Sequence, residues 1–296
     1  MEPRKIAVIG AGTMGNGIAQ VFAASGFDVL MTDVSDAAMK NGLAVIGNSL
    51  DRLLAKQKIT EADKKAILGR IRTSHRLEDA AHSDLVVEAV AENLELKLKL
   101  FAEMDRVVQP SAILATNTSS ISLTRLASAT KRPAQVIGMH FFNPVPLMQL
   151  VEVIRALQTS DATFAVVKAL ARKIGKTPVE VRNSPGFVAN RILLPMLNEA
   201  VYCLHERLAT AEDIDTVMKL GMAHPMGPLA LADLIGLDVC LAILEVLHEG
   251  FKDPKYRPCP LWREKVEAGQ LGRKSGSGFF SYEKDKLEPK PIRTAA

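Results

Sequence analysis

A short apolar run followed at once by three closely spaced glycines limits what the N-terminal half of this chain can fold into. Residues 5–9 (Lys-Ile-Ala-Val-Ile) read as a buried β-strand, and the segment 10–15 (Gly-Ala-Gly-Thr-Met-Gly) follows directly and opens a helix over 14–25. The first glycine of such a unit permits a tight turn, the second lets a pyrophosphate approach the backbone, and the third lets the helix pack close to the strand. The pattern predicts a dinucleotide site with the phosphates at the helix N-terminus, made by Gly10, Gly12, Thr13, Met14 and Gly15.

Asp33 indicates which dinucleotide binds. It ends a second strand, 27–32, and lies 18 residues after Gly15. A carboxylate at this place can accept hydrogen bonds from both ribose hydroxyls and would repel a 2′-phosphate. The sequence therefore favours NAD over NADP as the cofactor. The alternative is that Asp33 only caps the helix that follows it, for which Ser35 also offers an N-cap.

Strand-like and helical segments continue to alternate through the first half of the chain. Further strands are expected at 85–90, 112–116 and 136–142, and helices at 36–57, 61–70 and 94–108, with Thr60 capping the second of these helices. Such alternation is typical of an α/β domain whose mostly parallel sheet is covered by helices. We assign residues 1–183 to a Rossmann-type NAD-binding domain.

The pattern changes at the breaker cluster Asn183-Ser184-Pro185-Gly186. Beyond it, helical spacing dominates, with helices expected at 188–206, 211–220, 229–247 and 260–268, and the charged tail from Lys284 is expected to fray. Residues 184–296 are predicted to form an all-α domain that serves in substrate binding and dimerisation, because so small and apolar a domain often packs against a second subunit.

The overall composition is that of a soluble globular protein, with 48% hydrophobic and 24% charged residues. The formal net charge is +4, without a block of like charges, so we expect no nucleic-acid partner. The sequence contains no run of about 18 consecutive apolar residues, so we expect no membrane span. Three widely spaced cysteines, Cys203, Cys240 and Cys259, without metal-ligand spacing favour reduced thiols, a cytoplasmic protein and no metal site.

A histidine and a glutamate point to acid–base chemistry. His140 lies at the carboxyl end of the strand 136–142, the edge at which open α/β sheets bind their ligands. Glu152 lies in the apolar run 150–154, where an isolated carboxylate would be costly. A hairpin that turns near Pro146 would place the two side chains opposite each other, so that the carboxylate fixes the imidazole tautomer and stabilises its charged form. A purely structural pair is the alternative.

Three further motifs, in order, are specific enough to indicate a family. They are Asn117-Thr118-Ser119-Ser120, the segment 140–144 (His-Phe-Phe-Asn-Pro) and the segment 185–191 (Pro-Gly-Phe-Val-Ala-Asn-Arg). With the glycine-rich segment before them and Gly272-Arg273-Lys274-Ser275-Gly276 after them, the chain resembles the 3-hydroxyacyl-CoA dehydrogenases over nearly its whole length.

The resemblance implies roles for individual residues. It implies that His140 is the general acid/base, that Glu152 orients it, and that Ser119 and Asn190 contact the reacting oxygen. Ser119 would also contact the cofactor. The NAD site would further include Glu92, Lys97, Asn117, Asn143 and Lys274, and Ser49 and Lys56 would lie near the coenzyme A moiety.

The reaction implied is the NAD-dependent interconversion of an (S)-3-hydroxyacyl-CoA and a 3-oxoacyl-CoA, with a short acyl chain such as that of 3-hydroxybutanoyl-CoA and acetoacetyl-CoA. Two alternatives stay open at this point. One is a dehydrogenase of a sugar acid, similar to L-gulonate 3-dehydrogenase. The other is a nucleotide-binding structural relative without catalytic activity.

Overall fold

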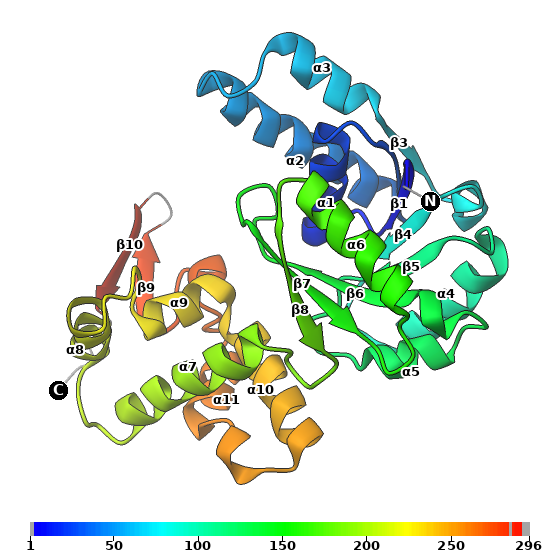
Figure 1. Cartoon of the computed structure of the whole chain (residues 1–296). Helices are drawn as coiled ribbons and strands as arrows, with labels where there is room; N and C mark the ends of the chain where they lie inside the picture. Colours follow the sequence, from blue (N-terminus) through cyan, green and yellow to red (C-terminus); the bar gives the residue numbers. More distant parts are fainter. Residues whose placement is uncertain (1–2, 284–285, 292–296) are drawn as a thin grey trace. The chain divides into compact units, whose positions relative to one another are not determined.

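The protein is described by a computed structural model covering residues 3–283 and 286–291. Its chain divides into two compact units, residues 1–184 and 185–296, at the breaker cluster. In Figure 1 the first unit runs from blue to green and the second from yellow-green to red.

The first unit is built on one eight-stranded sheet, with the strand order β3-β2-β1-β4-β5-β6-β7-β8. The strands are β1 (Lys5–Ile9), β2 (Asp28–Thr32), β3 (Ile71–Ser74), β4 (Leu85–Glu88), β5 (Ile113–Thr116), β6 (Val136–Phe141), β7 (Leu150–Arg155) and β8 (Thr177–Arg182). All neighbours run parallel except β6 and β7, which are antiparallel. The predicted mostly parallel sheet is confirmed.

Helices cover both faces of this sheet. They are α1 (Thr13–Ala24), α2 (Asp36–Ala55), α3 (Glu61–Gly69), α4 (Leu94–Val107), α5 (Leu123–Ser128) and α6 (Asp161–Lys173), with 3-10 turns η1 (Leu77–Ala80) and η2 (Pro133–Gln135). Buried side chains of α1, α2 and α6 form one core with alternate residues of the strands, among them Ile137 and Met139. Leu123 of α5 lies against Gly138, which separates these two residues, so α5 covers the opposite face.

The predicted helix starts are confirmed in detail. Ser35 caps α2 by accepting a hydrogen bond from the Ala38 amide. Thr60 caps α3 in a reciprocal box with Asp63, in which each side chain accepts a hydrogen bond from the other's backbone amide.

The second unit is helical, as predicted. It contains α7 (Ala189–His205), α8 (Ala211–Thr216), α9 (Pro228–Ile235), α10 (Leu237–Phe251) and α11 (Pro260–Glu267), with the short turns η3 (Val217–Gly221), η4 (Pro254–Tyr256) and η5 (Arg273–Ser275). Its own core includes Leu197, Leu244 and Trp262, all fully buried.

Three details of the second unit differ from the predictions. The helix expected over 229–247 is two helices, because Gly236 between α9 and α10 has a φ of 107°, which ends one helix and redirects the chain. The helix expected over 211–220 ends at Thr216 and continues as the π-helical turn η3. At the C-terminus, β9 (Phe280–Glu283) and β10 (Lys286–Pro291) form an antiparallel pair where fraying was expected. Residues 284–285 and 292–296 of that tail lie outside the described residues.

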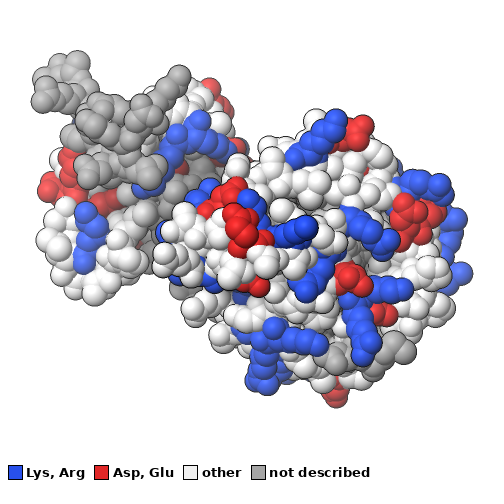
Figure 2. All heavy atoms as spheres, turned by 90° about the horizontal axis from the view of Figure 1, so that it is seen from above, with Lys and Arg blue, Asp and Glu red and all other residues white. Residues whose placement is uncertain are grey.

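Two further properties concern possible contacts with membranes and nucleic acids. None of the helices among the described residues is both long and apolar enough to cross a bilayer. Where Figure 2 shows described residues, basic and acidic side chains are interspersed rather than gathered by sign, unlike the basic stripe of a nucleic-acid-binding surface.

Candidate active site

The glycine-rich loop between β1 and α1 has the geometry of a phosphate cradle. Gly10 has a φ of 107°, and a Cβ there would lie 2.5 Å from the Ala89 carbonyl oxygen. A Cβ at Gly15 would lie 1.8 Å from the Gly10 carbonyl oxygen, so both positions require glycine. Gly12 and Thr13 are exposed, and among the described residues no heavy atom outside the adjoining backbone lies within 4 Å of where a Cβ of Gly12 would be. The loop therefore leaves open backbone beside the N-terminus of α1, where a pyrophosphate fits.

A buried amide that sequence reasoning missed supports this loop. Asn16 in the first turn of α1 is 6% exposed and donates from Nδ2 to the Gly12 carbonyl oxygen over 2.7 Å. Its position four residues after Gly12 is one helical turn, and that spacing is the signal that could have identified it.

Asp33 lies at the end of β2 beside the same loop. Its Oδ2 accepts from the Ala11 amide at 2.9 Å and its Oδ1 from the Ser35 amide at 3.0 Å. Each carboxylate oxygen keeps a second lone pair for a ribose hydroxyl. The cap of α2 is Ser35 rather than Asp33, which removes the helix-capping alternative. Loop, helix terminus and acid together fit NAD.

His140 and Glu152 are directly paired across β6 and β7, in the register that the predicted hairpin requires. The His140 Nδ1 lies 2.7 Å from the Glu152 Oε2, and the two residues are 7% and 2% exposed. An Nδ1 proton donated to this carboxylate fixes the tautomer in which Nε2 is the basic nitrogen. The pair therefore has the geometry of an oriented acid/base.

Asn117 brings the end of β5 to the end of β6. Its side-chain Oδ1 accepts from the Phe141 amide at 2.9 Å, immediately after His140. Its own amide donates to the Glu88 carbonyl oxygen at 2.8 Å. Asn117 thus places the segment that contains Ser119 next to the strand of the histidine.

Beneath that segment lies a buried ion pair that was not predicted as a pair. Glu88 and Lys97 are 0% and 1% exposed, and Lys97 Nζ lies 2.5 Å from Glu88 Oε1. The Thr116 hydroxyl donates to Glu88 Oε2 at 2.6 Å, and the Val90 amide donates to Oε1 at 2.8 Å. An acid inside the apolar strand 85–90 was the available signal, the same one that marked Glu152. We call Glu88, Lys97 and Thr116 the buried cluster.

Glu92 connects the buried cluster to the Ser119 segment. Its Oε1 accepts from the amides of Ser119 and Ser120 at 3.1 Å each, and from the hydroxyls of Thr118 and Ser120. Its Oε2 lies 3.3 Å from Lys97 Nζ. Burial works to raise the pKa of Glu92, but the Lys97 charge and the hydroxyl donors outweigh it and hold the pKa below its usual value. Direct contact of Glu92 and Lys97 with NAD remains a prediction.

The other predicted residues of the first unit lie on two elements. Asn143 is exposed on the turn after β6, next to a cis peptide bond to Pro144. Ser49 and Lys56 lie two turns apart on α2, where the Ser49 hydroxyl accepts from Gln20 at 3.0 Å and Lys56 is exposed at the C-cap. Their contacts with NAD and coenzyme A remain predictions.

Asn190 and Lys274 belong to the second unit. Asn190 is half-buried in the first turn of α7, and its amide donates to the Gly186 carbonyl oxygen at 3.1 Å. Lys274 Nζ binds both carboxylate oxygens of Asp238, at 2.5 and 2.7 Å. Burial works to raise the pKa of Asp238, but this ammonium holds it below its usual value. Asp238 is thus a partner of Lys274 that the sequence did not predict.

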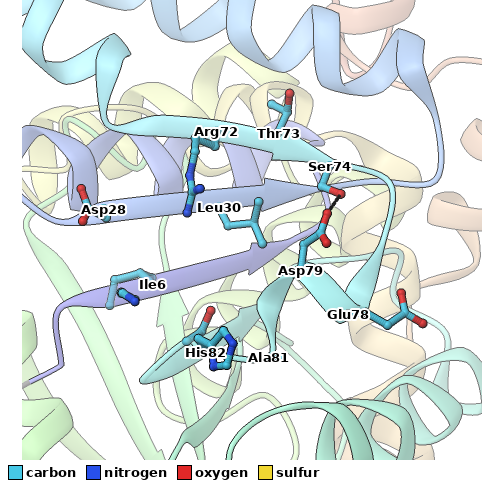
Figure 3. A pocket seen from close by; sticks show the side chains of 12 residues that line it. Ile6, Asp28, Leu30, Arg72, Thr73, Ser74, Glu78, Asp79, Ala81 and His82 are labelled. Carbon is cyan, nitrogen blue, oxygen red and sulfur yellow. Dashed lines mark hydrogen bonds between the residues drawn. The ribbon is translucent and has the colours of Figure 1, made fainter.

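A hollow of about 600 Å³ lies elsewhere on the first unit, over β1, β2 and β3 (Figure 3). Ile6 and Leu30 contribute to its lining, together with charged side chains such as Asp28 and Arg72. Its lining residues include none of the candidate site residues. The hollow therefore adds nothing to the site built above.

Comparison with protein families gives two matches that together span nearly the whole chain. Residues 5–184 match the model of the 3-hydroxyacyl-CoA dehydrogenase NAD binding domain, and residues 186–282 match that of the 3-hydroxyacyl-CoA dehydrogenase C-terminal domain. The chain belongs to the 3-hydroxyacyl-CoA dehydrogenase family. NAD is the cofactor of that family's N-terminal domain, as the glycine-rich loop and Asp33 predicted.

Relatives within the 3-hydroxyacyl-CoA dehydrogenase family are similar over nearly their full length. A probable 3-hydroxybutyryl-CoA dehydrogenase of Bacillus subtilis is 57% identical, over 96% of this chain and 99% of the relative. A 3-hydroxybutyryl-CoA dehydrogenase of Bradyrhizobium diazoefficiens is 54% identical, over 97% and 98%. The crystal structure of an (S)-3-hydroxybutyryl-CoA dehydrogenase from Ralstonia eutropha superposes with a TM-score of 0.93 at 56% identity, covering 96% of this chain and all of the other.

Proposed function

We propose that this protein is an NAD-dependent dehydrogenase that interconverts (S)-3-hydroxybutanoyl-CoA and acetoacetyl-CoA. The observation that carries the proposal is the His140–Glu152 pair, held in cross-strand register in the sheet whose first strand leads into the NAD cradle. The relatives named as 3-hydroxybutyryl-CoA dehydrogenases support the short acyl chain.

The proton steps fall to His140. In the oxidative direction its Nε2 takes the proton of the 3-hydroxyl group, and Glu152 stabilises the resulting imidazolium through Nδ1. In the reductive direction the imidazolium returns a proton to the oxygen of the former ketone. NAD, when bound, supplies the hydride chemistry at the carbon that carries this oxygen.

Two polar side chains are proposed to stabilise charge on the reacting oxygen. Ser119 lies on the segment that Glu92 fixes, with its amide bound to the Glu92 carboxylate. Asn190, from the second unit, is the other proposed donor. A positioned donor of this kind is worth about 2–4 kcal/mol of activation free energy.

We further propose a cytoplasmic homodimer that associates through the second unit. Large apolar side chains are exposed there, including Ile192 (67%), Leu208 (76%) and Leu220 (82%). Exposed apolar side chains such as these are available for burial in a subunit interface. Three cysteines without disulfide bonds support a reducing compartment.

The test is NADH oxidation with acetoacetyl-CoA by the purified protein, run beside NAD reduction with L-gulonate. We expect turnover with acetoacetyl-CoA and none with L-gulonate. The opposite result would favour the sugar-acid alternative. Tight NADH binding without turnover of either substrate would favour a non-catalytic relative.

A further inference from the structure

A single turn, residues 142–149, joins the strand of His140 to the strand of Glu152. It also carries the exposed Asn143. The Pro144 carbonyl oxygen accepts from the amides of Leu147 and Met148, at 3.0 Å each, so the turn is closed by its own hydrogen bonds. The turn is therefore the covalent connection between the two strands that carry the acid/base pair.

A buried lysine lies beneath the turn. Lys176, between α6 and β8, is 7% exposed, and its Nζ donates to the carbonyl oxygens of Val145 at 2.6 Å and Met148 at 2.7 Å. Among the described residues no carboxylate pairs with it, and burial lowers the pKa of its ammonium. A buried cation without a counter-ion is costly, so the two carbonyl contacts are the compensation that keeps it there.

The side chain of Val145 in this turn packs against α1, the helix at the proposed NAD site. Val145 is 2% exposed, and a Cβ built at Gly17 of α1 would lie 2.9 Å from the Val145 Cβ and 3.1 Å from its Cγ2. The turn is therefore held at its carbonyl groups by an ammonium and at the Val145 side chain by the helix that begins at the glycine-rich loop.

We infer that Lys176 is a positioning residue that fixes the 142–149 turn and thereby the placement of His140 and Asn143 relative to NAD. This inference rests on the proposed function. The lysine does not touch the reacting atoms. It acts through the main chain of the turn, which it ties at two carbonyl groups.

The decisive variant is Lys176→Met, which keeps the length of the side chain and removes its donors. Turnover of NADH with acetoacetyl-CoA should fall about 10–100-fold, because small misplacement of a reacting group has that effect. The dissociation constant of NADH, measured by nicotinamide fluorescence, should rise about five-fold, as for one lost hydrogen bond. The KM for acetoacetyl-CoA should not change.

A second variant perturbs the same turn through the Val145 side chain. Gly17→Ala places a methyl group against Val145. It should have the same effects as Lys176→Met: lower turnover and weaker NADH binding, with an unchanged KM for acetoacetyl-CoA. Lys65→Met, at an exposed lysine of α3, is the matched control and should behave as the wild type.

A purely structural lysine would give a different result. Folded Lys176→Met protein, verified by circular dichroism, would then melt at a lower temperature with wild-type turnover and NADH affinity, and that outcome overturns the inference. If Lys176→Met does not fold, Gly17→Ala decides by the same criteria. The proposed function fails separately, because it is judged on turnover by the wild type, whereas NADH affinity reports on the turn in either case.

Discussion

His140 has its Nδ1 side occupied by Glu152 at 2.7 Å, so the proposed proton exchange with a substrate would use Nε2. Replacing His140 by Gln keeps a polar side chain of similar size but removes the basic ring nitrogen. Turnover should fall about 10²–10⁴-fold, the usual contribution of a general acid/base, with NADH affinity little changed. Steady-state rates and fluorescence titration measure both quantities. His82→Gln, at an exposed histidine that lines the hollow, is the control, and near-wild-type turnover of His140→Gln would remove the residue from the mechanism.

Asp33 is the residue proposed to determine the choice between NAD and NADP. Two backbone amides fix its carboxylate, so its negative charge would repel a 2′-phosphate at that place. Asp33→Asn should lower the ratio of kcat/KM for NADH to kcat/KM for NADPH. Steady-state kinetics with both cofactors measure that ratio. Asp28→Asn, at the exposed start of the same strand, should leave the ratio as it is. An unchanged ratio in Asp33→Asn would refute the ribose role.

These residues were predictable because their signals are local. Asp33 stands at a fixed distance after the glycines, and Glu152 faces His140 across one turn. Lys176 offered no such signal, since it reaches Val145, 31 residues away, only after β8 joins the sheet. The pairing of Lys274 with Asp238 was equally unpredictable, because 36 positions in the sequence separate the two residues.

At the scale of helices and strands, the buried cluster joins the end of β4 to α4 and β5. Glu88→Gln would leave the Lys97 ammonium buried without its nearest counter-ion, which typically costs about 3–5 kcal/mol of unfolding free energy. Urea denaturation measures the loss. The double variant Glu88→Gln/Lys97→Met should recover part of it, because the buried ammonium, which among the described residues only Glu92 at 3.3 Å would still pair with, is gone, and Glu78→Gln on η1 serves as the control. A loss below about 1 kcal/mol would show that the pair contributes only as much as a surface ion pair.

Glu92 gives the segment that contains Ser119 a dependence on pH. Its pKa in the folded protein lies below the usual value, so the folded state favours the carboxylate. The stabilisation is complete above the pKa of the unfolded chain and is lost as the pH falls through the lower, folded pKa. The difference in melting temperature between wild type and Glu92→Gln should therefore be largest near neutral pH and shrink on acidification. A difference that grows towards acid pH would contradict the assigned direction.

Elements with local start and stop signals were predicted well. Ser35 and Thr60 mark their helices by side chains that bond within the first turn. Gly236 was overlooked because an isolated glycine in an apolar helical pattern is often tolerated. The helix breaks there because Gly236 has a φ of 107°, a conformation that residues with a side chain rarely adopt.

At the scale of the whole molecule, the exposed apolar side chains of the second unit should determine the oligomeric state. Leu220→Glu would place a charge on the proposed interface and should shift the protein from dimer to monomer, which light scattering after size exclusion measures. Leu157→Glu, at an equally exposed leucine of the first unit (84% against 82%), should leave the dimer intact. A dimer that survives Leu220→Glu would place the contact elsewhere.

The division into an α/β unit and a helical unit was predictable, because strand–helix alternation stops at one breaker cluster. The contacts that connect the end of the second unit to its centre were not predictable. Asp233 of α9 accepts from the amides of Phe279 and Phe280, more than 45 residues further along the chain. Such contacts arise from packing between distant segments, to which no local pattern refers.

The cross-strand pairing of His140 with Glu152 also fixes how many residues the chain can place between them. Side chains alternate between the two faces of a strand, so removing or adding one residue in the 142–149 turn would send Glu152 to the opposite face of the sheet. Surface connections ordinarily tolerate changes in length. Here the length of one connection is set by the pairing at its two ends, and one-residue deletions should be tolerated in exposed loops of the first unit that hold no candidate site residue, but not in this turn.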